Sequence, residues 1–134
     1  MINSKIIKLA SETEFHGLNN MFTHKSHVKN KFCGDNIKIE MIVKNNKIIS
    51  MRYEAYSCVY CQASANIIAK KINKVTIKNL REDVTNLNIL FNKKIAHSPK
   101  IHEHLKDLIN TNNIDRINCI MLPFEALQKA INNT

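Results

Sequence analysis

Apolar and polar residues alternate over residues 37–55, and this two-residue period predicts a β-hairpin. A first strand begins at Ile37, and a return strand runs from Lys47 to Ala55. Asn45 and Asn46 separate them, and Asn tolerates the positive φ that tight hairpin turns demand. The residues expected on the buried face are Ile37, Ile39, Met41 and Val43, then Ile49, Met51, Tyr53 and Ala55. A shorter, earlier strand is expected within residues 20–28.

Helical spacing of apolar residues appears on both sides of this hairpin. Gly17 provides a stop for the first helix, and Ser98 followed by Pro99 resembles an N-cap with a first-turn proline. Residues 110–113 interrupt the pattern and predict a loop. The predicted helices cover residues 3–15, 62–72, 76–91, 99–110 and 115–132. We therefore expect an α+β fold, a small three-stranded antiparallel sheet with helices packed on one side, in a single domain over residues 1–134.

Charge and composition narrow the class of protein. The formal net charge is +9, but the lysines are scattered, Trp is absent and no basic-aromatic motif of an RNA-binding sheet occurs. For these reasons we expect no nucleic-acid ligand. The positive charge would serve equally well to bind an acidic protein partner. No apolar run approaches the length of a membrane span, and the first residues lack a secretion signal. A cytoplasmic protein is expected.

Three cysteines in separate segments are the candidate chemistry. Cys33 lies 25 residues before Cys58, and Cys119 follows 61 residues later. In a reducing cytosol such thiols are ligands or nucleophiles more often than disulfide partners, although each alone could be a small buried hydrophobe. Each is expected at the end of an element, where the three can meet at one edge of the sheet. Asp35 could complete a tetrahedral shell, a donor set that suits zinc, and nearby Arg116 could offset part of its excess negative charge.

Three motifs, in order, resemble the U-type iron–sulfur cluster assembly proteins, the IscU, SufU and NifU N-terminal group, over residues 3–132. The motifs are Cys33-Gly34-Asp35 before an alternating strand, Cys58 ahead of Gln62-Ala63-Ser64-Ala65, and Arg116-Ile117-Asn118-Cys119 before Leu122-Pro123-Phe124-Glu125-Ala126-Leu127. The long second cysteine interval, Asn118 where IscU-type members carry His, and the absence of a Leu-Pro-Pro-Val-Lys motif are similar to the SufU branch.

The resemblance implies a SufE/IscU-like fold and a zinc ion bound by Cys33, Asp35, Cys58 and Cys119. It further implies that Cys33 accepts persulfide sulfur from a SufS-like cysteine desulfurase whose pyridoxal phosphate belongs to that partner, and that Arg116 steadies the anionic site. The alternative is a scaffold on which iron and sulfide form a [2Fe-2S] cluster on Cys33, Cys58 and Cys119 for transfer to apoproteins. A third alternative is a purely structural zinc domain. A downstream cluster scaffold or apoproteins would be further partners.

The sequence departs from the family pattern at several positions. Ser57 stands where relatives usually have Gly, and Lys31-Phe32 stands where they usually have Asn-Pro. Cys61 forms a C-x-x-C pair with Cys58, and three roles stay open for it: packing, replacement of Asp35 in a four-cysteine zinc site, or a second thiol for persulfide relay. The histidines are expected to be surface residues rather than ligands, and those considered are His24, His27, His97, His102 and His104.

Overall fold

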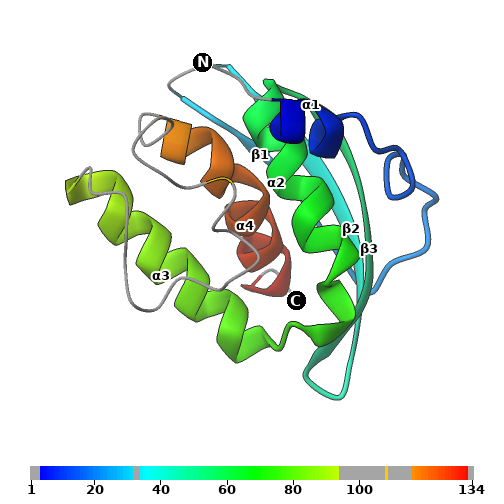
Figure 1. Ribbon diagram of the computed structural model, residues 1–134. Helices are drawn as coiled ribbons and strands as arrows, with labels where there is room; N and C mark the ends of the chain where they lie inside the picture. The colour runs from blue at the N-terminus through cyan, green and yellow to red at the C-terminus, as the bar shows by residue number, and fades with distance from the viewer. Residues whose placement is uncertain (1–3, 32–33, 94–107, 109–115, 133–134) are drawn as a thin grey trace.

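The computed structural model describes residues 4–31, 34–93, 108 and 116–132. Three antiparallel strands in the order β1-β2-β3 form one sheet within these residues, and the helices lie on one side of it (Figure 1). The elements are α1 (Ser4–Ala10), β1 (His24–Lys29), β2 (Asn36–Lys44), β3 (Lys47–Tyr56), α2 (Val59–Lys70), the 3₁₀ turn Ile72–Lys74, α3 (Ile77–Lys93) and α4 (Ile117–Asn132). The predicted α+β class is confirmed.

The core lies between the inner face of the sheet and the helices α2 and α4. On the sheet side, Ile37, Ile39 and Tyr53 are at most 1% exposed, and on the helix side Ile68 and Phe124 are fully buried. α3 packs against α4, on the side of α4 away from the sheet (Figure 1). α4 therefore lies between α3 and the sheet, and α2 contacts both α4 and β3.

The hairpin prediction is confirmed, with one correction to its buried face. Ile42 pairs with Ser50 but Val43 pairs with Ile48, so Ile49 has no partner on β2 and forms a β-bulge. The extra residue shifts the alternation by one position. Ile48 is therefore buried, whereas Ile49, which the pattern placed in the core, is 47% exposed.

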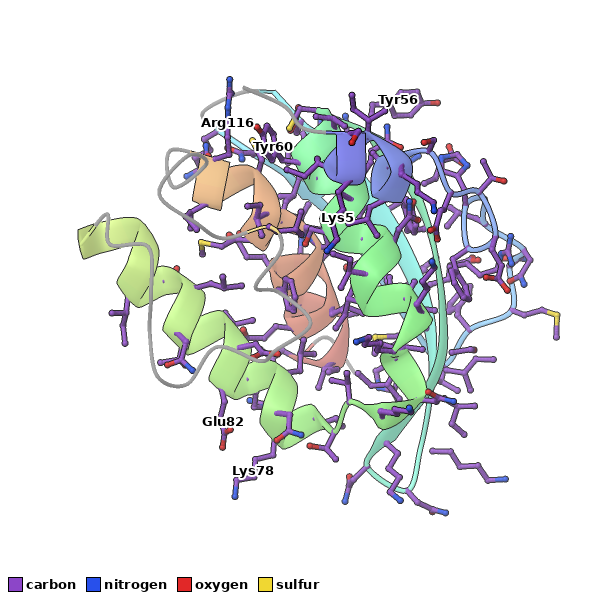
Figure 2. The ribbon with its side chains drawn as sticks, viewed as in Figure 1. Lys5, Tyr56, Tyr60, Lys78, Glu82 and Arg116 are labelled. Carbon is purple, nitrogen blue, oxygen red and sulfur yellow. The ribbon has the colours of Figure 1, made fainter. Side chains whose placement is uncertain are left out.

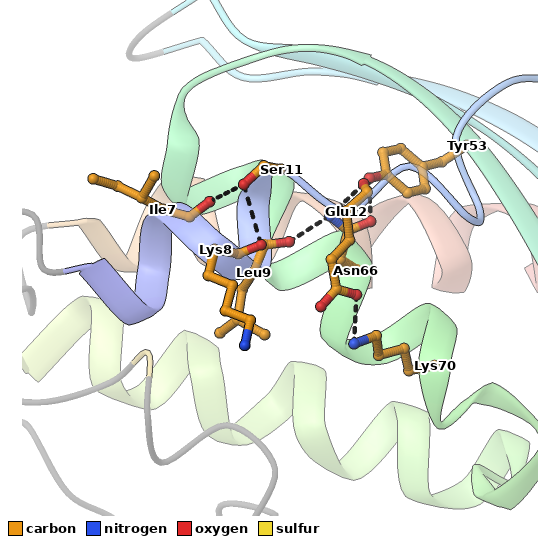
Figure 3. A network of polar contacts seen from close by, with 8 residues as sticks. All are labelled: Ile7, Lys8, Leu9, Ser11, Glu12, Tyr53, Asn66 and Lys70. Atoms are coloured by element: carbon orange, nitrogen blue, oxygen red, sulfur yellow. Dashed lines mark hydrogen bonds and ion pairs between the residues drawn. The ribbon is translucent and has the colours of Figure 1, made fainter.

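The first helix is shorter than predicted: α1 ends at Ala10, whereas the sequence pattern predicted a helix to residue 15. The Asn66 amide of α2 donates to the carbonyls of Leu9 at 2.6 Å and Glu12 at 3.1 Å, and it also accepts a hydrogen bond from the Tyr53 hydroxyl (Figure 3). These two carbonyls accept hydrogen bonds from a side chain of α2 instead of from backbone N–H groups one turn later, which would have continued α1. The end of α1 thus combines a local contact, from Ser11 to the Ile7 and Lys8 carbonyls, with a contact from far away in the sequence.

The remaining helices agree with the prediction within a few residues where the structure describes them. α2 begins at Val59, earlier than the predicted residue 62, and α4 begins at Ile117. The predicted strand near residues 20–28 is β1. Among the described residues, no helix combines the length and apolar character that crossing a bilayer requires. The predictions that lie outside the described residues are the helix over 99–110 apart from residue 108, the Ser98-Pro99 cap, the loop over 110–113 and the positions of His97, His102 and His104.

Candidate metal centre

Three element ends meet at one end of the molecule. Asp35 directly precedes β2, Cys58 is the N-cap of α2, and Cys119 lies in the first turn of α4. A carboxylate oxygen of Asp35 and the Sγ atoms of Cys58 and Cys119 all lie within 4.8 Å of one another. Cys33, the remaining predicted ligand, lies outside the described residues, two positions before Asp35 in the chain.

The loop that carries Asp35 is held by a short set of backbone bonds. The Asn30 N–H donates to the Asp35 carbonyl at 2.7 Å, and the Gly34 N–H donates to the Asn30 carbonyl at 3.1 Å. Gly34 has φ +74°, a left-handed conformation that glycine adopts without steric cost, which explains a glycine between Cys33 and Asp35. The Asn30 side-chain amide also donates to the Asn118 carbonyl at 3.2 Å, which joins this loop to the start of α4.

A second polar contact joins the two helices that carry the cysteines. The buried Ser64 hydroxyl of α2 donates to the Ile120 carbonyl of α4 at 2.7 Å. Pro123, inside α4, has no N–H to donate to the Cys119 carbonyl one turn earlier. Sequence analysis did not identify Asn30 or Ser64 as positioning residues. Asn30 carries no signal of its own, whereas Ser64 could have been suspected because it is a polar residue on the apolar face of a predicted helix.

The pKa of the half-buried Cys58 thiol is lowered to about 7. The largest cause is a hydrogen bond from the Cys119 thiol, and burial acts against it. The backbone N–H groups of Cys61 and Tyr60, in the first turn of α2, also lower the pKa, although the Cys58 side chain makes no capping hydrogen bond. The charge of Asp35 opposes them. A thiol of this kind is substantially a thiolate at neutral pH, which is the form that binds metals.

Asp35 is the clearest sign that the group accommodates a cation. Its side chain is 8% exposed, and Oδ2 is buried without a hydrogen-bond partner among the described residues. A buried carboxylate oxygen without a partner is costly unless a cation or donor compensates it. One carboxylate and two converging thiols, one of them readily ionised, form a donor set that zinc and iron both accept. The described residues therefore fit a metal.

The other predicted site residues lie around this group or away from it. Arg116 is exposed at the start of α4, with its guanidinium carbon 5.8 Å from the centre of the Tyr60 ring (Figure 2). Cys61 is fully buried in the core and is not part of the ligand group. Burial raises the pKa of Tyr53 to about 12, and the nearby Cys61 contributes to that shift. This position favours the packing role among the three that the sequence left open for Cys61.

Two further expectations can be compared with the described geometry. Ser57 is absent from the residues with positive φ, so it fits its backbone conformation without the glycine that relatives usually carry. His24 and His27 contact Thr23 and Asn36 on the sheet and do not join the ligand group. His27 is exposed, as the sequence predicted, whereas His24 is partly buried.

Comparison with known proteins gives concordant matches over nearly the whole chain. The family model described as the NifU-like N terminal domain matches residues 2–133. An uncharacterized protein of Borreliella burgdorferi is 30% identical, over 97% of this chain and 82% of its own length. The iron-sulfur cluster assembly scaffold protein IscU of Thermotoga maritima is 26% identical, over 98% of this chain and 92% of its own length.

Solved structures show the same fold at lower sequence identity. A NifU-like protein (N-terminal) from Brucella abortus has a TM-score of 0.82 at 19% identity, covering 97% of this chain and 91% of its own. The putative iron-sulfur cluster assembly scaffold protein for the SUF system from Fervidobacterium islandicum has a TM-score of 0.80 at 22% identity, covering 97% and 96%. At these identities the likeness establishes the fold.

Proposed function

Because the chain belongs to the NifU-like N-terminal domain family, the IscU, SufU and NifU group of iron–sulfur cluster assembly proteins, we propose that it is a zinc-dependent sulfurtransferase. Its sulfur donor would be a SufS-like cysteine desulfurase. Zinc would be held by Cys33, Asp35, Cys58 and Cys119, and Cys33 would accept the sulfur. The single observation that carries the proposal is the convergence of Asp35, Cys58 and Cys119 within 4.8 Å, directly beside the chain position of Cys33.

The proposed transfer is a thiol–persulfide exchange. The Cys33 thiolate attacks the terminal sulfur of the persulfide on the desulfurase, a new S–S bond forms on Cys33, and the old S–S bond breaks. Its electron pair leaves with the desulfurase cysteine as a thiolate, so no oxidant or reductant is consumed. Zinc, when bound, supplies positive charge that keeps its cysteine ligands deprotonated. Cys58 and Asp35 would then serve as ligands and not as acceptors.

The chain itself offers features that favour this role over a scaffold. The interval between Cys58 and Cys119 is long, and Asn118 stands in the position before the third cysteine where IscU-type members carry His. A residue without an imidazole at this position offers one cluster ligand fewer. The Asn118 carbonyl instead accepts the hydrogen bond from Asn30, a structural contact.

A scaffold role is the second candidate, favoured by the printed names of the Thermotoga maritima and Fervidobacterium islandicum relatives. In that case a [2Fe-2S] cluster would be cargo, assembled on Cys33, Cys58 and Cys119 and passed to apoproteins. Both roles use the same thiols. They differ in what the protein does to a desulfurase and in which metal it retains.

One experiment separates these roles. The protein is purified without oxygen, its metal is quantified, and a SufS-like desulfurase is assayed with and without it. Bound zinc together with faster desulfurase turnover supports the transferase. The scaffold role would be supported instead if the protein contains no zinc, leaves desulfurase turnover unchanged and assembles a cluster. A structural zinc domain would be indicated if Cys33→Ser kept its zinc and supported cluster synthesis as well as the unmodified chain.

A further inference from the structure

The second face of the sheet, opposite the helices, is only partly covered. The segment between α1 and β1 crosses one end of this face (Figure 1). It is held there by Arg52, whose Nε donates to the Gly17 carbonyl at 2.7 Å. Glu40 also holds it, because its carboxylate accepts the N–H groups of Asn19 at 2.9 Å and Asn20 at 3.0 Å. Arg52 and Glu40 are therefore engaged by the protein itself, and Lys25, which pairs with Glu40 across the strands, lies over the Phe22 ring.

The described part of the chain leaves the other half of the face uncovered, and two lysines lie there. Lys29 of β1 pairs with Asn36 of β2, and Asn36 pairs with Tyr56 of β3. In the next row of the sheet, Lys38 pairs with His27 on one side and with Glu54 on the other. Strand alternation places these residues on the side opposite the buried residues. We call Lys29, Lys38 and Tyr56 the basic face; all three are exposed, and Tyr56 is 67% exposed.

The lysines of the basic face are not neutralised within the described part of the chain. An ion pair found among the described residues joins Lys70 to Glu12, and no described carboxylate lies within ion-pair distance of Lys29 or Lys38. Glu54, opposite Lys38 in the sheet, does not approach it closely enough to pair. Two exposed lysines without an ion pair in the described part of the chain, beside a large exposed aromatic ring, favour contact with a negatively charged surface.

The basic face adjoins the candidate metal centre. Tyr56 ends β3 two residues before Cys58, and the Lys29–Asn36 pair closes the loop that contains Cys33 and Asp35. Tyr56 and Tyr60 lie at the same end of the molecule as Arg116 (Figure 2). A partner that rests on this face therefore lies beside the chain segments that lead to Asp35 and Cys58.

We propose that the basic face is the docking surface for an acidic patch on the sulfur donor, a cysteine desulfurase. This inference rests on the proposed function, since it names how the donor of that same reaction is recognised. Tyr56 would be the central contact and the lysines would steer and orient the partner, because complementary charges mainly set encounter rate and specificity. One exposed ring does not form the row of stacking platforms that single-stranded nucleic acid requires, which favours a protein partner.

The test is direct binding of the desulfurase, without its cysteine substrate, to four forms of the chain. These forms are the unmodified protein, Lys29→Glu/Lys38→Glu, Tyr56→Ser, and a control with the same charge change, Lys74→Glu/Lys78→Glu. Lys74 and Lys78 are exposed, and Lys78 lies at the far end of the molecule from Tyr56 (Figure 2). All four substituted lysines are on the surface, so each variant should fold, which circular dichroism verifies.

We expect Lys29→Glu/Lys38→Glu to raise the Kd about tenfold or more and to weaken its salt dependence. Tyr56→Ser should raise the Kd at every salt concentration, and the control should bind within about twofold of the unmodified chain. Equal losses in both charge variants would overturn the proposal, as would an unmodified chain whose binding ignores salt. The proposal would also be overturned if substitutions in the basic face weakened binding of a labelled DNA or RNA oligonucleotide but not binding of the desulfurase.

The two proposals fail in different ways. If the unmodified chain binds through the basic face but receives no sulfur, the transferase function is wrong and the docking surface stands. If it receives sulfur while the basic-face variants bind normally, the docking surface is wrong and the transferase function stands. Failure of the unmodified chain to bind the desulfurase at all overturns the docking proposal.

Discussion

Cys58 illustrates how a single side chain is prepared for chemistry by its position. It is the N-cap of α2, and its sulfur receives a hydrogen bond from the Cys119 thiol. Both features stabilise negative charge on the Cys58 sulfur and outweigh the opposing effects of burial and Asp35. The chain spacing predicted this convergence at element ends. It did not predict that two of the cysteines would contact each other directly.

The first prediction concerns the pH dependence of Cys58 alkylation in metal-free protein. Because the pKa of Cys58 is lowered to about 7, its reaction with iodoacetamide should reach half its maximal rate near pH 7 and slow below it as the thiolate is protonated. Peptide mass spectrometry over a pH series measures this rate. The Cys119→Ala variant lacks the donor and should move the midpoint upward. An unmodified Cys58 that titrates at or above the ordinary thiol value of about 8.5 would contradict this account.

The second prediction separates metal binding from stability at Asp35. Without metal, Asp35→Asn should leave the free energy of unfolding unchanged or raise it by about 1–3 kcal/mol, because an unpartnered buried oxygen loses its charge. With zinc present the variant should be the less stable form, since a ligand is lost. Urea denaturation with zinc and with a chelator measures both. Glu54→Gln, a half-exposed carboxylate on the sheet, is the control and should respond equally in both conditions.

At the scale of elements, local sequence patterns predicted most of the secondary structure. The observed helices and strands differ from this prediction where residues distant in the sequence contact each other. Two-residue alternation and the Asn45-Asn46 turn were sufficient to predict the hairpin, and both asparagines do have positive φ, 55° and 62°. The bulge at Ile49 was not predicted, because Ile48 and Ile49 are both apolar and the pattern alone does not say which of the two is buried. The early end of α1 depends in part on Asn66, a residue more than fifty positions away that no local signal connects to it.

The third prediction tests that distant contact. Asn66→Leu should lower the free energy of unfolding by about 2–4 kcal/mol, because it leaves the Tyr53 hydroxyl and the Leu9 and Glu12 carbonyls without their buried partner. Lys70→Ala removes the exposed ion pair with Glu12 and should cost less than about 1 kcal/mol. Thermal or urea unfolding compares the two. Equal losses would contradict the role assigned to the buried amide, which Figure 3 shows beside the ion pair.

The fourth prediction concerns the contact that sets the ligand loop against α4. Asn30→Ala removes the amide donor to the Asn118 carbonyl, so Asp35 should be positioned less well. We expect zinc affinity to fall about tenfold, the size of effect typical of residues that orient metal ligands, with the fold retained. Competition with a chromophoric chelator measures the affinity. Ser26→Ala, which removes a comparable hydroxyl bond from β1 to the Ala126 carbonyl farther along α4, should change it little.

At the scale of the whole molecule, the two faces of the sheet differ in what they carry. The helical layer brings Cys58 and Cys119 to one end of the sheet, and the uncovered half of the opposite face carries the unneutralised lysines. The sequence predicted the layers and the meeting of Asp35, Cys58 and Cys119 from periodicity and element ends, whereas Cys33 lies outside the described residues. The sequence itself provided only the total charge of +9, because the grouping of Lys29 and Lys38 depends on the strand register.

The central claim is that Cys33 receives sulfur, and peptide mass spectrometry tests it most directly. The protein is incubated with a SufS-like desulfurase and cysteine under anaerobic conditions, and persulfides are trapped by alkylation. We expect the mass gain of one sulfur atom on the peptide that contains Cys33, retained in Cys61→Ala and absent in Cys33→Ala. Sulfur on Cys61 or Cys58 in the Cys33→Ala variant, at the level of the unmodified chain, would contradict the claim.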